Sequence, residues 1–178
     1  EEQERLAKMV NDMLWLAKSD HGLLKPVEVT LNLASEASEL FDFFGALAEE
    51  RQIVLALEGQ VPTIQGDRAM LRRAISNLLS NAIRHTPSGG RVQIRLAAAS
   101  NHEVSLSVQN PGPGIPAEHL AKIFGRFFPF CPSRTRQSES AGLGLAIVRS
   151  IVKAHGGRVE AASAQNKTTF TLFLPYTT

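Results

Sequence analysis

The sequence has few of the features that mark several common classes of protein. Its single cysteine, Cys131, excludes an internal disulfide framework and a cysteine-rich zinc site. It has no run of about 18 apolar residues, so no membrane-spanning helix is predicted. The net charge is only +2 and the longest basic cluster is Arg72-Arg73, so we expect no nucleic-acid partner.

What the sequence does have is the composition of a globular chain. It is 178 residues long, with 43% hydrophobic and 20% charged residues, which suits one domain, or one domain with an appendage, around a sizeable core. The chain has no initiating methionine and opens on Glu1-Glu2-Gln3 as if within a helix. We therefore expect it to be a fragment of a longer protein.

Residues 1–20 are predicted to form one helix with a wide apolar stripe. The stripe consists of a heptad-like seam and its flanking positions: Leu6, Met9, Met13 and Leu16, widened by Val10, Leu14 and Ala17. Such a stripe needs a partner, which is either the chain's own domain or a second helix of a hairpin that dimerises into a four-helix bundle. Gly22 is expected to end the helix as its C-cap.

The remaining sequence alternates between helical and strand patterns. Helices are predicted over residues 34–51, 67–84, 117–123 and 143–155. Strands are predicted within 23–31, a linker that runs into the first strand, and over 53–57, 91–97, 103–109, 158–162 and 168–174. The expected fold is an α/β sandwich, a mixed sheet with about three helices on one face.

Four short motifs follow one another in the second half of the chain. They are Asn77-Leu78-Leu79-Ser80-Asn81-Ala82, Asn110-Pro111-Gly112-Pro113-Gly114-Ile115, Ile123-Phe124-Gly125-Arg126-Phe127-Phe128 and Gly142-Leu143-Gly144-Leu145-Ala146-Ile147-Val148. Taken singly, they also fit solvent-facing asparagines, an ordinary Pro-Gly turn, a core aromatic cluster and a glycine loop packed on the sheet. Their order and spacing together predict a nucleotide pocket with a movable lid.

Three of these motifs carry residue types that suit a nucleotide and its cation. Asn77 and Asn81 lie one helical turn apart, and an amide oxygen is a good ligand for Mg²⁺, which takes few protein ligands. Glycines at 112 and 114 allow the backbone to pass close to a planar ligand. Gly142-Leu143-Gly144 opens a helix whose N-terminal N–H groups suit phosphate, although the segment is not a P-loop.

The four motifs resemble the N, G1, F and G2 boxes of sensor histidine kinases, within the GHKL superfamily whose ATPase domains have the Bergerat fold. The match looks nearest to the heavy-metal-responsive branch, and residues 5–22 resemble the second helix of a dimerisation hairpin. The resemblance implies domains at 1–22 (dimerisation helix), 23–33 (linker and first strand) and 34–178 (catalytic ATP-binding domain).

The resemblance also implies roles for individual residues. Asn81 would hold Mg²⁺, Asn77 would support the phosphate side, and Arg84 and Arg134 would offset phosphate charge. The remaining nucleotide contacts would come from His85, Asn110, Gly112, Gly114, Ile115, Phe128, Gly142, Leu143, Gly144 and Leu145. His85 is equally able to stack or to cap its helix end. Arg134 and Arg136 lie in the lid, where a charged loop that simply stays solvated is the alternative.

Two departures from the family pattern stand out. Asn110 occupies the position of an acidic residue that accepts a hydrogen bond from the adenine amino group; its amide oxygen can still accept, without charge assistance. The lid segment Pro129-Phe130-Cys131-Pro132 is apolar and stiff where relatives carry charges. Cys131 is interpreted as a substitution and not as a functional thiol.

The resemblance implies transfer of the ATP γ-phosphate to a histidine, followed by relay to an aspartate of a response regulator receiver domain. None of the five histidines has the context of the acceptor, which would lie on a helix absent from this chain, so the fragment is expected to bind ATP without autophosphorylating. The intact protein would be a homodimer in a bacterial inner membrane, anchored by segments outside this chain, with this part in the cytoplasm. The alternatives are another GHKL ATPase and a non-catalytic nucleotide-binding or scaffold domain.

Overall fold

A computed structural model describes residues 2–100, 102–128 and 142–176 of the chain. Its helices are α1 (Glu2–Asp20), α2 (Leu33–Glu50), α3 (Arg68–His85), α4 (Ala117–Leu120) and α5 (Gly144–Ala154). Its strands are β1 (Val29–Leu31), β2 (Val54–Glu58), β3 (Ile64–Gly66), β4 (Arg91–Ser100), β5 (Glu103–Pro111), β6 (Arg158–Ala164) and β7 (Lys167–Pro175).

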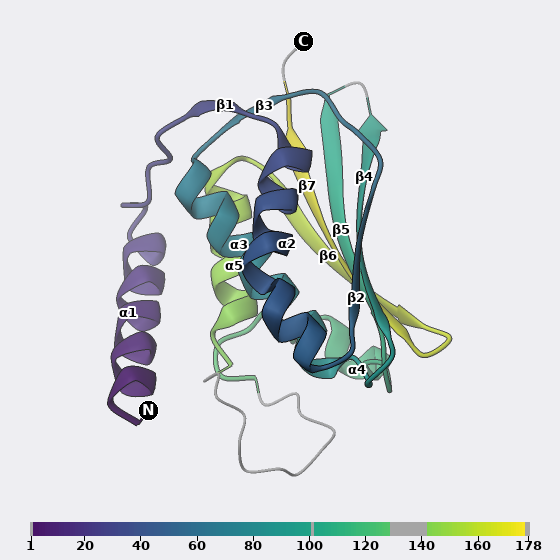
Figure 1. The fold of residues 1–178 in the computed structure, drawn as a ribbon. Coiled ribbons are helices and arrows are strands. Elements are labelled where there is room, and N and C mark those ends of the chain that lie inside the picture. The colour runs from purple at the N-terminus through teal and green to yellow at the C-terminus, as the bar shows by residue number, and fades with distance from the viewer. Residues whose placement is uncertain (1, 101, 129–141, 177–178) are drawn as a thin grey trace.

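Five of the strands form a mixed sheet in the order β2-β4-β5-β7-β6. Strands β2 and β4 are parallel, and every other pair in this sheet is antiparallel. Helices α2, α3 and α5 cover one face of the sheet (Figure 1). The mixed sheet and the three covering helices that the sequence predicts are therefore confirmed.

The strand patterns explain why one face of the sheet is covered and the other faces solvent. Along β5 every second residue is buried, including Val104, Leu106 and Val108, while the serines between them are only half-buried. This two-residue alternation places the apolar side chains under the helices. Burying them supplies the main driving force that holds the two layers together.

Two local predictions need correction. The sequence predicts no strand near residue 64, yet β3 pairs antiparallel with β1 in a separate two-stranded sheet, which places the linker strand beside α3. A three-residue strand is too short to show the alternation by which strands are predicted. The helix expected over 117–123 ends as α4 at Leu120 and continues in turns.

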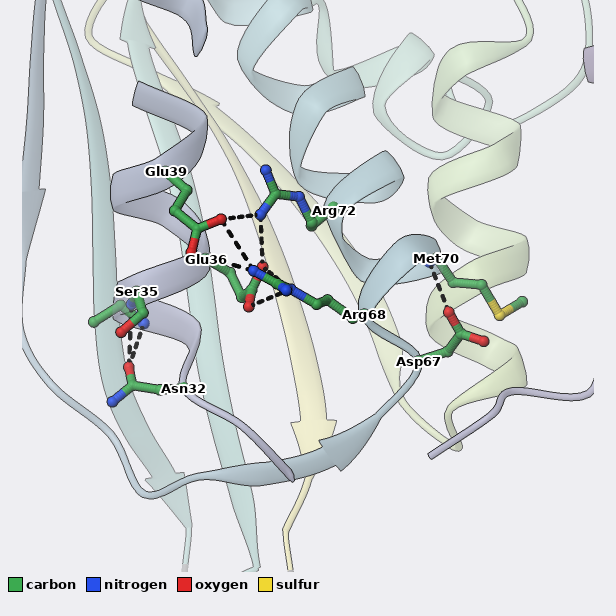
Figure 2. A network of polar contacts seen from close by, with 9 residues as sticks. Asn32, Ser35, Glu36, Glu39, Asp67, Arg68, Met70 and Arg72 are labelled. Atoms are coloured by element: carbon green, nitrogen blue, oxygen red, sulfur yellow. Dashed lines mark hydrogen bonds and ion pairs between the residues drawn. The ribbon is translucent and has the colours of Figure 1, made fainter. Parts of the chain in front are cut away.

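Helix α3 is fixed at its first turn by Asp67. The Asp67 Oδ1 atom accepts a hydrogen bond of 3.0 Å from the Met70 N–H, which makes Asp67 the N-cap (Figure 2). Its Oδ2 atom accepts 2.9 Å from the Val27 N–H in the linker, and its own N–H donates 2.9 Å to Nε2 of His155. Burial raises the pKa of Asp67, but these backbone donors outweigh it and leave the pKa below its ordinary value.

A charge network joins α2 to α3. Glu36 is buried, and it accepts hydrogen bonds from Arg68 (2.9 Å) and Arg72 (3.0 Å), which also pair with Glu39 (Figure 2). A buried carboxylate is costly unless it is paired and hydrogen-bonded. The two arginines satisfy Glu36, so the network specifies how α2 sits against α3.

Helix α1 lies outside the helical layer, on the side away from the sheet, and packs on α5 (Figure 1). Leu16 is 3% exposed in this contact, whereas the stripe residues Leu6, Val10, Met13 and Leu14 are about half-exposed. The predicted packing of α1 on its own domain is confirmed for one edge of the stripe, and the predicted second helix of a hairpin stays a prediction. The Gly22 N–H and the Leu23 N–H close the helix end on Ser19 and Lys18, as the C-cap prediction expects.

No helix in the described ranges is long and apolar enough to cross a membrane.

Candidate functional site

Helix α3 presents its two asparagines at the edge of its buried face. Leu78 and Leu79, which lie between them in sequence, are fully buried, whereas Asn77 and Asn81 are half-buried. The Asn77 Nδ2 atom donates a hydrogen bond of 3.2 Å to the Gly144 carbonyl oxygen at the start of α5. The Asn81 side chain makes no hydrogen bond within the described part of the chain, so its amide is available to a ligand.

The turn after β5 is held by the β6–β7 hairpin. The Gly112 N–H donates 2.9 Å to the Asn166 carbonyl oxygen, and the Ile115 N–H donates 2.8 Å to the Ser163 hydroxyl. Gly114 has φ +78°, and a Cβ atom there would lie 2.8 Å from the same hydroxyl, so only glycine fits. A Cβ atom on Gly112 would lie 2.9 Å from the carbonyl oxygen of His85, which brings the turn against the end of α3.

Asn110 lies at the end of β5, with 3% of the residue exposed. Its Nδ2 atom donates 2.9 Å to the Pro111 carbonyl oxygen. This bond fixes the orientation of the amide and leaves Oδ1 as the acceptor. The predicted acceptor role of Asn110 is therefore compatible with the local geometry.

Thr168 is a buried polar residue that the sequence analysis missed. It is 6% exposed and is the cross-strand partner of Asn110 in the β5–β7 register. Directly paired side chains on one face of a sheet lie within contact reach of each other. The only sequence signal was a threonine in an otherwise regular strand, which β-propensity alone explains.

The glycine segment before α5 brings two further motifs together. Gly142 has φ +69°, and its carbonyl oxygen accepts 3.1 Å from the Phe127 N–H. Leu143 is 1% exposed, so its side chain belongs to the core and only its backbone can face a ligand. Leu143 is also the N-cap of α5 and has no side-chain acceptor, so the helix start keeps its positive dipole end for an anion.

The end of α3 carries Arg84 and His85, both half-buried. Burial, and then the positive charges of Arg84 and Arg51, lower the pKa of His85. His85 is therefore neutral at pH 7 and can act as a hydrogen-bonding or stacking group. The C-cap is Thr86, whose hydroxyl donates 2.6 Å to the Ala82 carbonyl oxygen, so His85 is not the residue that caps the helix.

The aromatic motif at 123–128 divides between core and surface. Phe124 is 7% exposed and packs edge-on against Phe170 with ring centroids 6.0 Å apart. Phe128 is half-buried and lies 5.4 Å from the ring of His119. Phe127 is 51% exposed at φ +55°, so the expectation that all three phenylalanines are core is wrong for this residue. Its backbone contacts Gly142.

Arg134, Arg136 and Cys131 lie outside the described residues, as does the Pro129-Phe130-Cys131-Pro132 segment.

Contacts between these segments bring all four motifs to one end of the sheet. Asn77 joins the first motif to the fourth, Phe127 joins the third to the fourth, and Gly112 abuts the residue that ends α3. No group of three or more His, Cys, Asp or Glu suited to a metal occurs among the described residues.

Comparison with known proteins supports this assembly. A profile of the family described as histidine kinase-, DNA gyrase B- and HSP90-like ATPase matches residues 66–178. The chain is 49% identical over 175 residues to the sensor histidine kinase CusS of Escherichia coli strain K12, a match that covers 98% of this chain and 36% of CusS. The chain thus spans about a third of that relative's length.

Two solved structures share the fold over nearly the whole chain. Full-length ShkA in complex with AMPPNP superposes with a TM-score of 0.85 at 28% identity, covering 97% of this chain and 36% of that one. Histidine kinase ThkA in complex with the response regulator protein TrrA superposes with a TM-score of 0.79 at 26% identity, covering 99% and 48%. The family profile, CusS and the ThkA structure confirm the predicted resemblance to sensor histidine kinases.

Proposed function

The chain belongs to the histidine kinase-, DNA gyrase B- and HSP90-like ATPase family, among its sensor histidine kinases, and we propose that it positions ATP for phosphoryl transfer to a protein histidine. Family membership makes it an ATP-binding domain. The observation that carries the proposal is the hydrogen bond from Asn77 to the Gly144 carbonyl oxygen, because it holds the amide-bearing helix against the glycine-led start of α5. Catalysis of phosphoryl transfer is mostly positioning and charge stabilisation.

The adenine end of the proposed site lies at the end of β5. The Oδ1 atom of Asn110 would accept from the adenine amino group, since its Nδ2 atom is committed to Pro111. Gly112 and Gly114 would let the backbone run close to the base, with Ile115 beside it. Thr168 would support Asn110 from the paired strand, and Ser163 would hold the turn in place.

The phosphate end lies between α3 and α5. Asn81 would hold Mg²⁺, which neutralises phosphate charge when bound. Arg84 would add positive charge, and the backbone N–H groups at Gly142, Gly144 and Leu145 would face the phosphates at the helix start. Asn77 acts as a positioning residue, because its amide donor is already used by Gly144. Phe128 and His85 would border the site, and Arg134 would approach it from the lid.

The phosphoryl acceptor would lie outside this chain. His85 is half-buried, and His155 is held on both ring nitrogens by Asp67 and the Ile151 carbonyl oxygen. His21 and His102 lie in turns, and His119 lies on the short α4. The acceptor would be a histidine on the first helix of the dimerisation hairpin, with α1 as the second helix and residues 34–178 as the catalytic domain.

The rest of the proposal concerns the intact protein. It would be an inner-membrane homodimer with this part in the cytoplasm, would respond to heavy metals, and would pass its phosphoryl group to a response regulator. Support comes from the exposed stripe on α1, from the similarity to CusS and from the superposition on ThkA bound to TrrA. The match to CusS spans 98% of this chain, so it includes most of α1, which favours a sensor kinase over another ATPase of the family.

Isothermal titration with a non-hydrolysable ATP analogue, in the presence and then the absence of Mg²⁺, tests the proposal. We expect saturable micromolar binding that weakens when Mg²⁺ is removed. Absence of saturable binding below millimolar concentration would overturn the proposal and favour a scaffold. GTP is the matched control ligand. The carbonyl oxygen of its base would face Oδ1 of Asn110, and two acceptors form no hydrogen bond with each other.

A further inference from the structure

A cleft lies between α1 and α5, on the side of α5 that faces α1. It is an open cleft of about 450 Å³, lined at its floor by apolar side chains and at its rim by charged and polar ones. The floor includes Leu16, Leu24, Ala146 and Ala154, and the rim includes Ser19, Asp20, Arg126, Arg149, Ser150 and Lys153. The two walls come from different parts of the chain, so the cleft exists only while α1 is docked.

The docking of α1 rests on Trp15 and on two carboxylates. The Trp15 Nε1–H donates 3.2 Å to the Ser150 hydroxyl, and the guanidinium of Arg73 lies 4.5 Å from the centre of the indole ring. Arg73 also pairs with Asp12 at 2.6 Å. At the other end of the helix, Asp20 pairs with Arg126. A cation over an aromatic ring and paired charges together favour one docked position.

The cleft carries an excess of positive charge. Three cations meet one carboxylate, and that carboxylate, Asp20, is already taken by Arg126. Arg149 and Lys153 form no ion pair within the described residues. They lie one turn apart on α5, so their charges point along one face of the helix. Their natural complement is a pair of carboxylates at the same spacing on another helix.

We propose that this cleft is a docking site for an acidic helical segment of a partner protein. Two carboxylates of the segment would meet Arg149 and Lys153, and an apolar side chain between them would cover the half-buried part of the floor at Leu24 and Ala154. Exposed charges alone bind weakly, but the apolar floor adds contact area and the charges set orientation and partner choice. Because α1 supplies one wall, the bound segment would also stabilise the docked position of α1.

Trp15 is the chain's only tryptophan, so its fluorescence reports on this region directly. The probe is a helical peptide with glutamates at every fourth position and leucine between them, titrated into the 178-residue chain. We expect a saturable change in Trp15 emission that weakens as salt is raised. The double variant Arg149→Glu with Lys153→Glu should lower the affinity for the peptide by about tenfold or more, because like charges then face each other.

Two controls separate this site from general charge attraction. Lys8→Glu with Arg91→Glu makes the same change in net charge at exposed positions outside the cleft, and should leave peptide affinity within about twofold. A peptide with lysine in place of glutamate should not bind. Equal weakening in the two double variants, or no saturable binding of the acidic peptide, would overturn the proposal. Titration of the ATP analogue should be unchanged in all variants, so failure here is distinguishable from failure of the nucleotide site.

Discussion

The side-chain amide of Asn77 donates a hydrogen bond to the carbonyl oxygen of Gly144, 67 residues later in the chain. This bond joins the helix that carries both asparagines to the start of α5. We expect Asn77→Ala to weaken binding of the ATP analogue by roughly fivefold, because one neutral hydrogen bond contributes about 1 kcal/mol. Ser76→Ala, at a neighbouring half-buried position, should leave affinity unchanged. Equal effects of the two changes would show that Asn77 does not position the site.

Asn81 should behave differently from Asn77, because its amide has no partner in the described structure. Asn81→Ala is expected to abolish the Mg²⁺-dependent part of ATP binding while the thermal unfolding midpoint stays near that of the original chain. Titration with and without Mg²⁺ measures the first effect, and circular dichroism measures the second. Undiminished Mg²⁺ dependence in this variant would rule out Asn81 as the metal ligand.

Asn110 offers a test of how adenine is read. Asn110→Asp keeps the acceptor and adds charge, so we expect ATP affinity to be retained or to rise by a few fold. Asn110→Leu removes the acceptor at nearly the same size and should weaken binding by about tenfold or more, because a buried donor on adenine is left unpaired. A large loss in Asn110→Asp would mean that the Nδ2 donor is required, either for its bond to the Pro111 carbonyl oxygen or for the ligand itself.

Ser163 should act on the nucleotide through the Gly112–Ile115 turn. Ser163→Ala removes the hydroxyl that accepts from the Ile115 N–H, and so leaves the turn attached to the β6–β7 hairpin only through the bond from Gly112 to Asn166. We expect the affinity for the ATP analogue to fall by a few fold and amide hydrogen exchange at residues 112–115 to become faster. Ser105→Ala, also half-buried but on β5 and bonded to β4, is the matched control and should change neither quantity.

His85 should make folding stability depend on pH. Its pKa is lowered in the folded chain, chiefly by burial, so below about pH 6.5 the unfolded chain binds a proton that the folded chain resists. The free energy of unfolding is therefore expected to fall as the pH drops through this range. His85→Gln should reduce that slope, and Ser105→Ala, which removes no ionisable group, should not. Denaturant titrations at pH 7.5 and 5.5 measure the difference, and parallel slopes in all three chains would contradict it.

Helices α2, α3 and α5 could be predicted because their signals are local. The buried face of α3, from Met70 to Ile83, follows the helical period directly, and Asp67 is a regular N-cap residue. The four motifs could likewise be found from short stretches of sequence, and the glycines at 114 and 142 do adopt positive φ. What the resemblance added was the expectation that these separate segments share one ligand.

The features that sequence reasoning missed depend on contacts between distant segments. Thr168 matters because the β5–β7 register sets it opposite Asn110, and no spacing within β7 reveals that register. The docking of Trp15 on Ser150 and Arg73 joins residues more than 50 positions apart, while the periodicity of α1 shows only that some partner is needed. The exposure of Phe127 follows from a positive φ that its residue type does not announce.

Asp67 has a mechanical consequence for the whole molecule. One oxygen of its carboxylate accepts a hydrogen bond from the Val27 N–H in the linker, and the other accepts from the Met70 N–H in the first turn of α3. One side chain thus connects the segment that follows α1 to the helix that carries Asn77 and Asn81. The linker is also joined to α3 through the pairing of β1 with β3, and α1 contacts α3 directly where Arg73 pairs with Asp12. A displacement of α1 would therefore reach the helix that carries the proposed phosphate site both at its first turn, through Asp67, and one turn later, through Arg73.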